Sequence, residues 1–454
     1  MRFSALICAA TLLAPSLASA NELLRTYDLA AQNDTTLQSA RHLHDATVEA
    51  LPLNRGPLLP QINGVGSASR QHDDLNAPQF NPLTGAPLGY ARATKSSQPF
   101  SVSLNFSQVL FDWGAFKRYS QADDTVASAE AAFAQAQQNL VFRVAQAYFG
   151  MLAAADTVNT DEAARRALEQ QLEQANKRFE VGLAAITDVQ DAQSSYDAAV
   201  SQKIKDEGAL GTAMRAVTFI TNSPLSEVRI ALLKDDIPLV GPDPVDVHQW
   251  LKAADDGNLD LALARLKASS AEKDVAIRRA GHYPTLSLNG TDARVKSSGF
   301  QEFYDDQTRV GVQLNVPIFS GGATQASVSQ AEATYQQSLA DLEGARRNAA
   351  VRTDNDYAAV LTAIATVKST KQTVASSTTA FEASKVGLEV GTRTQVDVLT
   401  AQQKLQTAQQ AYYAARYTYL QAVLTLKLDV GRLSQKDIAD FDKLLTDAGP
   451  ALAH

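Results

Sequence analysis

The placement of proline constrains this chain more than any other feature of its sequence. Residues 100–223 contain no proline, and neither do residues 318–449, whereas the 15 prolines of the 454-residue chain lie before, between and after these tracts. Because proline removes a backbone donor and clashes with the preceding turn, tracts without it permit long helices. A helix of nearly 70 residues spans about 100 Å at 1.5 Å per residue, so these helices must pack sideways on others.

The two proline-free tracts are copies of each other. A shift of 209 positions carries residues 180–182 onto 389–391, with the sequence Glu-Val-Gly in both places. The same shift aligns seven further identical residues, which are Asn139, Arg143, Tyr148, Leu152, Ala154, Thr157 and Val158 with Asn348, Arg352, Tyr357, Leu361, Ala363, Thr366 and Val367. Self-similarity at a fixed spacing indicates an internal duplication.

Each copy is predicted to form a helical hairpin with a narrow apolar seam. The seam follows the spacing i, i+3, i+4, i+7 that is typical of coiled-coil packing, and we expect its residues to be core. Gly182 and Gly391 each end a long helix, because glycine readily adopts the left-handed conformation of a C-terminal cap. In the second copy Thr394 and Asp397 have the T-x-x-D spacing of a capping box, which places Asp397 in the first turn of the returning helix.

A strand pair with period-two alternation precedes each long helix. Apolar residues alternate with polar ones over 102–107 and 310–316, and less regular partner strands lie at 60–70 and 284–296. One apolar and one polar face suit a strand between lipid and water, although an ordinary soluble hairpin with one buried face has the same pattern. Phe111, Trp113 and Phe319 lie where strand passes into helix, as in an interfacial aromatic girdle.

Four strands per chain are too few to close a barrel, since about eight are the minimum. If the strands span a membrane, several copies must therefore contribute to one barrel. Three copies supply twelve strands and twelve helical rods, but the same arithmetic also allows a dimer or a tetramer.

Residues 1–20 resemble a secretory signal peptide, with Arg2 at its start, an apolar centre and the small residues Ala18-Ser19-Ala20 at its end. The only cysteine, Cys8, lies within this segment, so we expect no disulfide in the exported chain. After residue 20 the sequence contains no apolar run of 18 residues, and we expect no transmembrane helix. The formal net charge of −8 without a basic cluster argues against binding nucleic acid.

Several longer segments resemble one family. Residues 178–190 (RFEVGLAAITDVQ) and 390–399 (VGTRTQVDVL) are similar to the two periplasmic-tip motifs of TolC-type outer-membrane export channels, and the resemblance continues at 56–61 and 415–420. It implies a mainly α protein with a membrane β-barrel. The internally duplicated protomer would belong to a trimeric 12-stranded β-barrel continuous with a 12-helix periplasmic α-barrel and a small equatorial α/β belt.

The resemblance also implies a division of the chain. The expected parts are a signal peptide (1–20), N-terminal helices (21–58), a first β-hairpin (59–111), a first long helix with its returning helix (112–222, tip at 182–188), an equatorial segment (223–250), a helix leading to the barrel (251–282), a second β-hairpin (283–319), a second long helix with its returning helix (320–432, tip at 391–397) and a C-terminal equatorial tail (433–454).

By the same resemblance, the helical tips form a gate. Asp397 occupies the position whose carboxylates ring the constriction, with Thr400 one turn above it. Thr187 and Asp188 resemble the residues that hold Arg393 and latch the hairpins closed, and Leu388 stands where the family has a latch tyrosine. Tips that contact a periplasmic adaptor would include the residues of both turns, namely Gly182, Leu183, Gly391 and Thr392.

Two departures from the family pattern bear on this gate. Leu388 and Thr400 replace a tyrosine and an aspartate, so the gate is expected to be less tightly latched and to carry one acidic ring. The residues alone leave alternatives: Asp397 can be only a helix cap, and Asp188 with Arg393 only a weak exposed ion pair.

The sequence therefore predicts a passive exit duct in the outer membrane, reaching into the periplasm, for tripartite efflux and type I secretion. The implied partners are two further copies of the chain, a periplasmic membrane-fusion adaptor, an inner-membrane ABC or RND-type pump and outer-membrane lipid. Six scattered histidines and the absence of catalytic motifs predict no enzyme activity, no cofactor and no metal. A periplasmic coiled-coil adaptor or structural protein of an export complex is the alternative, although adaptors normally carry one hairpin rather than two.

Overall fold

The computed structural model describes residues 21–224, 230–299 and 302–446, which form two compact units. The first unit holds the described residues up to His42 together with Ala132–Ala262 and the residues from Gly344 onward. The second holds Leu43–Ala131 and Leu263–Glu343. Each unit thus draws on both copies of the duplication. The expected signal peptide at 1–20, including Cys8, lies outside the described residues, as do parts of the expected equatorial segments (225–229 and 447–454).

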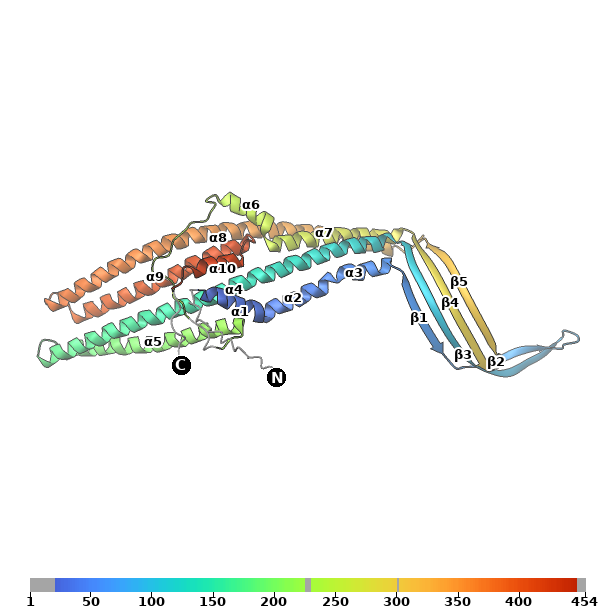
Figure 1. Cartoon of the computed structure of the whole chain (residues 1–454), viewed down its shortest axis with the longest axis horizontal. Helices are drawn as coiled ribbons and strands as arrows, with labels where there is room; N and C mark the ends of the chain where they lie inside the picture. The colour runs from blue at the N-terminus through green and yellow to red at the C-terminus, as the bar shows by residue number, and fades with distance from the viewer. Residues whose placement is uncertain (1–20, 225–229, 300–301, 447–454) are drawn as a thin grey trace, which may run out of the picture. The chain divides into compact units, whose positions relative to one another are not determined.

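The two proline-free tracts form the longest helices, as Figure 1 shows. Helix α4 runs over Trp113–Glu180 and α8 over Ala323–Glu389, with 68 and 67 residues. Each is followed after a short turn by a returning helix, α5 at Ile186–Thr221 and α9 at Gln395–Asp429. The shift of 209 residues maps the two helices and the turn of the first hairpin onto those of the second to within about one residue.

The shorter helices also occur in corresponding places, apart from α10, which has no counterpart among the described residues. They are α1 (Glu22–Asn33), α2 (Thr35–Val48), α3 (Ala50–Arg55), the 3-10 helix η1 (Gly56–Leu58), α6 (Val247–Gly257), α7 (Leu259–Arg279), the 3-10 helix η3 (Ala280–His282) and α10 (Gln435–Asp442). Asp34 separates α1 from α2 and Asn258 separates α6 from α7. Both side chains cap the following helix, by accepting hydrogen bonds from the N–H groups of Leu37 (2.7 Å) and Leu261 (2.9 Å).

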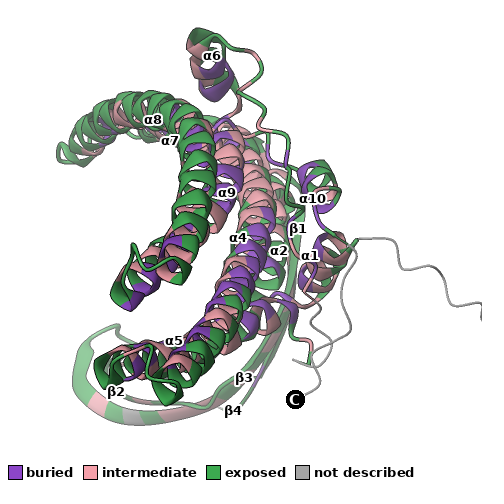
Figure 2. Ribbon diagram, turned by 90° about the vertical axis from the view of Figure 1, so that its left-hand side faces the viewer, coloured by how far each residue is buried: buried purple, intermediate pink, exposed green. Residues whose placement is uncertain are grey.

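The hydrophobic core of the first unit is formed by residues of α1, α4, α6, α8 and α10 together with the C-terminal halves of α5 and α9. Figure 2 shows buried residues along α4, α9 and α10. The expected seam is buried in the middle of α4, where Tyr148, Met151 and Leu152 are at most 1% exposed, and Val158 at its end is partly buried. In α8 the seam is only partly buried, because Val360 is 1% exposed whereas Leu361 is 46% exposed in the single chain.

The two segments expected to form an equatorial belt meet in the first unit. Leu233 and Leu445 form an antiparallel bridge. The guanidinium of Arg416, on α9, is 1% exposed and its Nη2 donates to the carbonyl oxygens of Leu233 (3.0 Å) and Lys234 (2.9 Å). These two bonds from a buried arginine hold the segment against α9, while Nε of Arg416 has no hydrogen-bond partner among the described residues.

The second unit contains an antiparallel sheet with the order β1-β3-β4-β5, in which β2 also pairs with β3. The strands are β1 (Gln61–Ala68), β2 (Gln71–Phe80), β3 (Pro87–Phe111), β4 (Thr285–Gly299) and β5 (Phe303–Asn315). The sheet of one chain is open, since β1 and β5 form its two edges and do not pair with each other among the described residues.

The first strand pair is much longer than the alternation in the sequence predicts. Strand β3 begins at Pro87 rather than near residue 100, and β2 pairs with it over Gln71–Phe80. The acidic and proline residues of β2 resemble a loop in sequence, but Asp74 is bound across the ribbon by Arg92 (3.0 Å) and Thr94 (2.6 Å). The partner strand expected at 60–70 is present as β1, which pairs with β3 over Gln61–Ala68, and β2 extends the pair beyond what the alternation predicts.

Apolar side chains gather on one face of the sheet. Val102 and Leu104 of β3 share that face with Val310 and Val312 of β5, and all four are about half or more exposed in the single chain. The alternation that the sequence predicts for these strands is thus present. Among the described helices, none combines the length and the apolar character needed to cross a membrane.

Candidate functional site

The turn of the first hairpin is a glycine-capped helix end. Gly182 has a φ of +75°, and the N–H of Leu183 donates to the carbonyl of Arg178 at 2.7 Å. This pattern closes the last turn of α4 and reverses the chain. At the start of α5 the carboxylate of Asp188 accepts a hydrogen bond from the N–H of Ala185 at 3.3 Å. Thr187 lies beside it and is exposed.

The turn of the second hairpin has the same backbone and a fuller cap. Gly391 has a φ of +78°, and the N–H of Thr392 donates to the carbonyl of Gly387 at 2.8 Å. The carboxylate of Asp397 accepts from the N–H and from the hydroxyl of Thr394, both at 2.9 Å, while the Asp397 N–H donates to the Thr394 hydroxyl at 3.2 Å. These bonds from Thr394, with the charge of Arg393, lower the pKa of Asp397.

Arg393 lies over a glycine that has no counterpart in the first hairpin. A Cβ atom built on Gly387 would be 2.6 Å from Cγ of Arg393, so only glycine leaves room for this side chain. In the first copy the equivalent positions hold Arg178 and Ala184. Each tip therefore carries one arginine and one small residue at these two positions, but their places are exchanged. Arg393 was predicted from the sequence, but its packing against Gly387 was not. The alignment of the two copies contains the signal, because it places Arg178 opposite Gly387.

The single chain pairs Arg393 with its own hairpin. Its Nη1 lies 4.0 Å from Oδ1 of Asp397, in an exposed ion pair. Within the described part of one chain, no ion pair joins Arg393 to Asp188. Leu388, the other residue expected at the latch, is half-buried at the end of α8, and Thr400 is exposed on α9.

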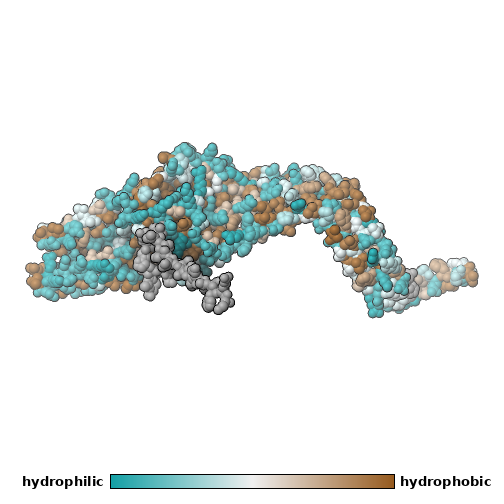
Figure 3. Space-filling view, viewed as in Figure 1, coloured by the Kyte–Doolittle hydropathy of each residue, from teal (hydrophilic) through white to brown (hydrophobic). Residues whose placement is uncertain are grey.

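Both tips expose apolar side chains. Leu183 is 71% exposed and Val390 is 68% exposed, and the turn residues beside them, Gly182, Gly391 and Thr392, are exposed as well. Figure 3 shows apolar colour at the ends of both hairpins. Exposed apolar groups at the end of a polar rod are typical of a surface that meets another protein.

Polar contacts above the tips link the two hairpins to each other. Asp161 on α4 accepts hydrogen bonds through Oδ1 from the side-chain amides of Gln406 (2.9 Å) and Gln410 (2.8 Å) on α9. Closer to the tips, the amide of Gln395 donates to Gln171 at 3.5 Å, and both side chains are buried. These links are not predictable from the sequence, because an acid or a glutamine on a long polar helix is usually solvated.

A groove of about 600 Å³ runs between α5 and α9 in the same region. Its lining is rich in amides and hydroxyls, and it includes Thr400, Gln406 and Gln410. The groove therefore brings solvent to one of the candidate gate residues and to the glutamines that link the hairpins.

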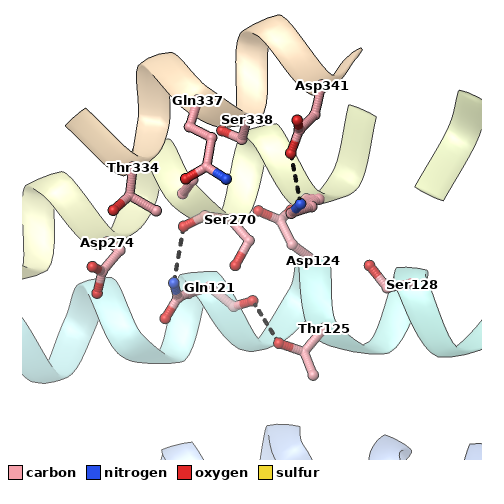
Figure 4. A pocket seen from close by; sticks show the side chains of 12 residues that line it. Gln121, Asp124, Thr125, Ser128, Ser270, Asp274, Thr334, Gln337, Ser338 and Asp341 are labelled. Atoms are coloured by element: carbon pink, nitrogen blue, oxygen red, sulfur yellow. Dashed lines mark hydrogen bonds and ion pairs between the residues drawn. The ribbon is translucent and has the colours of Figure 1, made fainter. Parts of the chain in front are cut away.

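A second cavity, of about 450 Å³, lies between α4, α7 and α8 in the second unit (Figure 4). Each of its three carboxylates already has a cation: Lys273 binds Asp124 (2.8 Å), Lys267 binds Asp341 (2.9 Å) and Arg278 binds Asp274 (3.4 Å). Because these carboxylates are already paired, the cavity offers a ligand no unpaired carboxylate among the described residues that line it. In the described chain no cluster of three or more acidic, histidine or cysteine side chains is placed to hold a metal.

Comparisons with known proteins agree with this geometry. The family profile described as "Outer membrane efflux protein" matches residues 26–223 and 250–432, which span both copies. "Outer membrane protein TolC" of Vibrio cholerae is 33% identical over 430 residues, covering 93% of this chain and 93% of that protein. "Proteases secretion protein PrtF" of Dickeya chrysanthemi is 29% identical over 426 residues, covering 93% of this chain and 90% of that protein.

The fold is also found among solved structures. The Campylobacter jejuni CmeC outer membrane channel matches with a TM-score of 0.75 at 19% identity, covering 94% of this chain and 90% of that one. At this identity the match concerns the fold. It supports the expected fold class, a mainly helical duplicated chain with a sheet contributed to a barrel.

Proposed function

The chain belongs to the outer membrane efflux protein family, and from that premise we propose that its two hairpin tips form the gate of a passive exit duct. The protein is an outer-membrane exit duct for efflux and type I secretion, located in the outer membrane and reaching into the periplasm. Members of this family are channels. We infer no catalytic step for this chain, and the energy for export comes from a partner.

The construction of the two tips is the observation that supports a gate at this end of the hairpins. Both turns are fixed by left-handed glycines and both returning helices begin at an acid-capped turn. The hairpins that end in these turns are joined to each other through side-chain amides and a carboxylate. Polar links of this kind can be exchanged for bonds to water at low net cost, which suits an interface that must open.

In this gate Asp397 and Thr400 line the constriction. Thr187, Asp188, Arg393 and Leu388 form the latch between hairpins. In the single chain Arg393 is already bound to Asp397, so a latch to Asp188 is a contact between neighbouring copies or one made on closure.

The partners follow from the open sheet and the exposed tips. One chain leaves both sheet edges unpaired, so a homotrimer supplies the strands that complete the barrel in outer-membrane lipid. The residues Gly182, Leu183, Gly391 and Thr392 contact a periplasmic membrane-fusion adaptor, which recruits an inner-membrane ABC or RND-type pump. The alternative of a periplasmic adaptor is disfavoured because the chain carries two hairpins and an open sheet with an apolar face.

Single-channel conductance in planar bilayers tests the gate. Arg393→Ser should raise the conductance of the closed channel, because it removes the only basic side chain among residues 181–185 and 390–394, which connect the helices of the two hairpins. Arg178→Ser is the matched control, since it removes an arginine from the equivalent region of the first tip without touching the latch. Equal conductance in the wild type and in Arg393→Ser, or an equal rise in both variants, would contradict the assignment.

Asp397→Asn distinguishes a role of Asp397 in the constriction from a role as a helix cap only. The amide still accepts hydrogen bonds from Thr394, so the cap survives while the charge is lost. A ring of carboxylates favours cations in a pore, and the variant should therefore lower cation selectivity. If selectivity is unchanged, Asp397 serves the helix only.

A further inference from the structure

A buried carboxyl group lies at the junction of three helices in the first unit. Asp161 of α4 is only 1% exposed. Its Oδ1 accepts two hydrogen bonds from α9, through Gln406 and Gln410. Its Oδ2 is buried and receives no hydrogen bond from an N–H or hydroxyl group of the described chain. A buried oxygen without a donor requires an explanation, because it has lost its water.

Asp161 has a second carboxyl group beside it. Asp206 of α5 is in hydrogen-bonding contact with Asp161, and its own Oδ2 accepts from the amide of Gln202 at 2.7 Å. Two ionised carboxylates in contact repel each other strongly. A single proton held between them removes the repulsion and supplies the donor that Oδ2 lacks.

Among the described residues of α4 and α5, the cations next to the pair in sequence are bound to other carboxylates, apart from Lys205 of α5, which is exposed. Lys203 of α5 is bound to Glu162 of α4 at 3.0 Å and to Glu207 at 3.4 Å. Glu162 also binds Arg165 at 3.0 Å and Arg166 at 2.6 Å, so these arginines are committed as well.

Helix α9 presents only uncharged amides to the pair. Its nearest charged residues along the chain are Lys404, which is exposed, and Arg416, which is bound to carbonyl groups near the equatorial segments. The groove lined by Gln406 and Gln410 also contains the carboxylate of Asp191, whose negative charge cannot compensate the pair.

We propose that Asp161 and Asp206 share one proton, and that this proton keeps the first hairpin joined to α9 of the second. This inference rests on the proposed function of the hairpins as a gate. When the proton leaves, two carboxylates remain in contact, and that of Asp161 is shielded from water. Their repulsion is relieved when α9 separates and solvent reaches Asp161, which breaks the bonds to Gln406 and Gln410. The closed state is then favoured in acid and the open state near neutrality.

The direction and size of the effect follow from the titration of the pair. Burial, and next the contact with Asp206, raise the pKa of Asp161 from 3.8 to about 6. A carboxyl whose pKa is raised in the closed state stabilises that state fully below its ordinary pKa and loses the effect as the pH rises through 6. If opening restores the ordinary pKa, the open-to-closed ratio rises roughly tenfold per chain between pH 5 and pH 7.

Conductance measured from pH 4.5 to 7.5 tests the device. The wild type should open with increasing pH across this range. Asp161→Asn keeps an amide oxygen for the two glutamines and an amide donor for Asp206, so it mimics the protonated pair and should remain closed with a flat pH profile. Asp197 is an exposed carboxylate on α5, the helix that carries Asp206. Asp197→Asn is therefore the control and should retain the wild-type profile. A wild-type profile that is flat, or one that Asp161→Asn leaves intact, would overturn the proposal.

An infrared pH titration tests the proton without relying on the gate. The wild type should lose a protonated-carboxyl band near pH 6, and this band should be absent from both Asp161→Asn and Asp206→Asn. If the band is present but conductance does not follow it, the pair shares a proton and the proposed function fails. If the band is absent, the proposal of a shared proton fails. The proposed gate is then tested separately through Arg393→Ser. A pH response that disappears with a chelator and returns with Ca²⁺ would assign the pair to a metal ion instead.

Discussion

Asp34 joins three parts of the first unit, and its substitution by asparagine is the sharpest test of how the unit is held together. The side chain is 5% exposed at the junction of α1 and α2. Its two oxygens accept hydrogen bonds from Nη1 (3.0 Å) and Nη2 (2.8 Å) of Arg143 on α4, and Oδ1 also caps α2 through the N–H of Leu37. Asp34→Asn retains the volume and one acceptor but turns an amide N–H₂ towards the guanidinium.

The expected cost lies between those of a buried and an exposed ion pair. Breaking a fully buried pair costs about 3–5 kcal/mol. The Arg143 side chain is 33% exposed and can recover part of its hydration, and the cap can survive, so about 2–3 kcal/mol is expected. An unfolding entropy of about 2.1 cal/mol/K per residue over 454 residues converts this cost into a lowering of the Tm by about 2–3 °C.

The pH dependence adds a second criterion. Burial by itself would raise the pKa of Asp34, but the hydrogen bonds from Arg143 and Leu37 outweigh it and hold the pKa below 3.8. A lowered pKa means that the carboxylate stabilises the fold above pH 3.8 and loses this effect as the pH falls through the folded-state pKa. The difference between wild type and Asp34→Asn should therefore be full at pH 7 and shrink below pH 4.

Thermal unfolding of the detergent-solubilised protein, followed by the helical circular dichroism signal, measures both criteria. Arg25→Ala is the control, because Arg25 forms an exposed pair with Glu22 at 3.5 Å in the same unit, and its loss should change the Tm by less than about 1 °C. A Tm for Asp34→Asn that matches this control at pH 7, or a difference that persists unchanged at pH 3, would refute the reasoning.

Three further predictions concern other buried or strained groups. Tyr417→Phe removes the hydroxyl that donates to buried Asp156 at 2.7 Å and should destabilise the first unit by about 1–3 kcal/mol, seen as a lower Tm at pH 7; an unchanged Tm would contradict it. Burial and the neighbouring Asp429 raise the pKa of Asp356 to about 7, so stability is lost as the pH rises from about 4 to 7, and Asp356→Asn should flatten the Tm profile over that window and raise the Tm at pH 8. Gly391→Ala forces alanine to a φ of +78° at a cost of about 1–2 kcal/mol, which should speed hydrogen exchange of the tip amides; equal exchange rates would show that the turn tolerates a Cβ.

The long helices and their ends could be predicted because local chemistry determines them. The two proline-free tracts, the duplication and the glycines that end α4 and α8 are all visible in the sequence. The ribbon of β2 and β3 could not be predicted in the same way. Residues such as Asp74 and Pro78 are typical of loops, and the segment is seen to be a strand only from its pairing with β3, which the contacts of Asp74 with Arg92 and Thr94 support.

The candidate site was predictable only where one hairpin forms it. The capping box of Thr394 and Asp397 lies within four residues of sequence, and the structure contains it. The roles of Asp397, Asp188 and Arg393 in a gate remain predictions, because they depend on neighbouring copies. Asp161 could not be identified beforehand, since its importance arises from side chains on α5 and α9 that lie 45 and about 245 residues away in sequence.

The exchange of arginine and small residue between the two tips has a consequence for any closed ring of these chains. A duplicated chain supplies two hairpins with nearly the same backbone, so three chains would arrange six similar hairpins around one axis. Two features occur in only one hairpin of each chain. One is the packing of Arg393 against Gly387, and the other is the carboxyl pair of Asp161 and Asp206. The ring would thus have close to sixfold symmetry in its backbone and only threefold symmetry in its charges. Alternate hairpins can then differ in how readily they move, which a ring of six identical hairpins could not achieve.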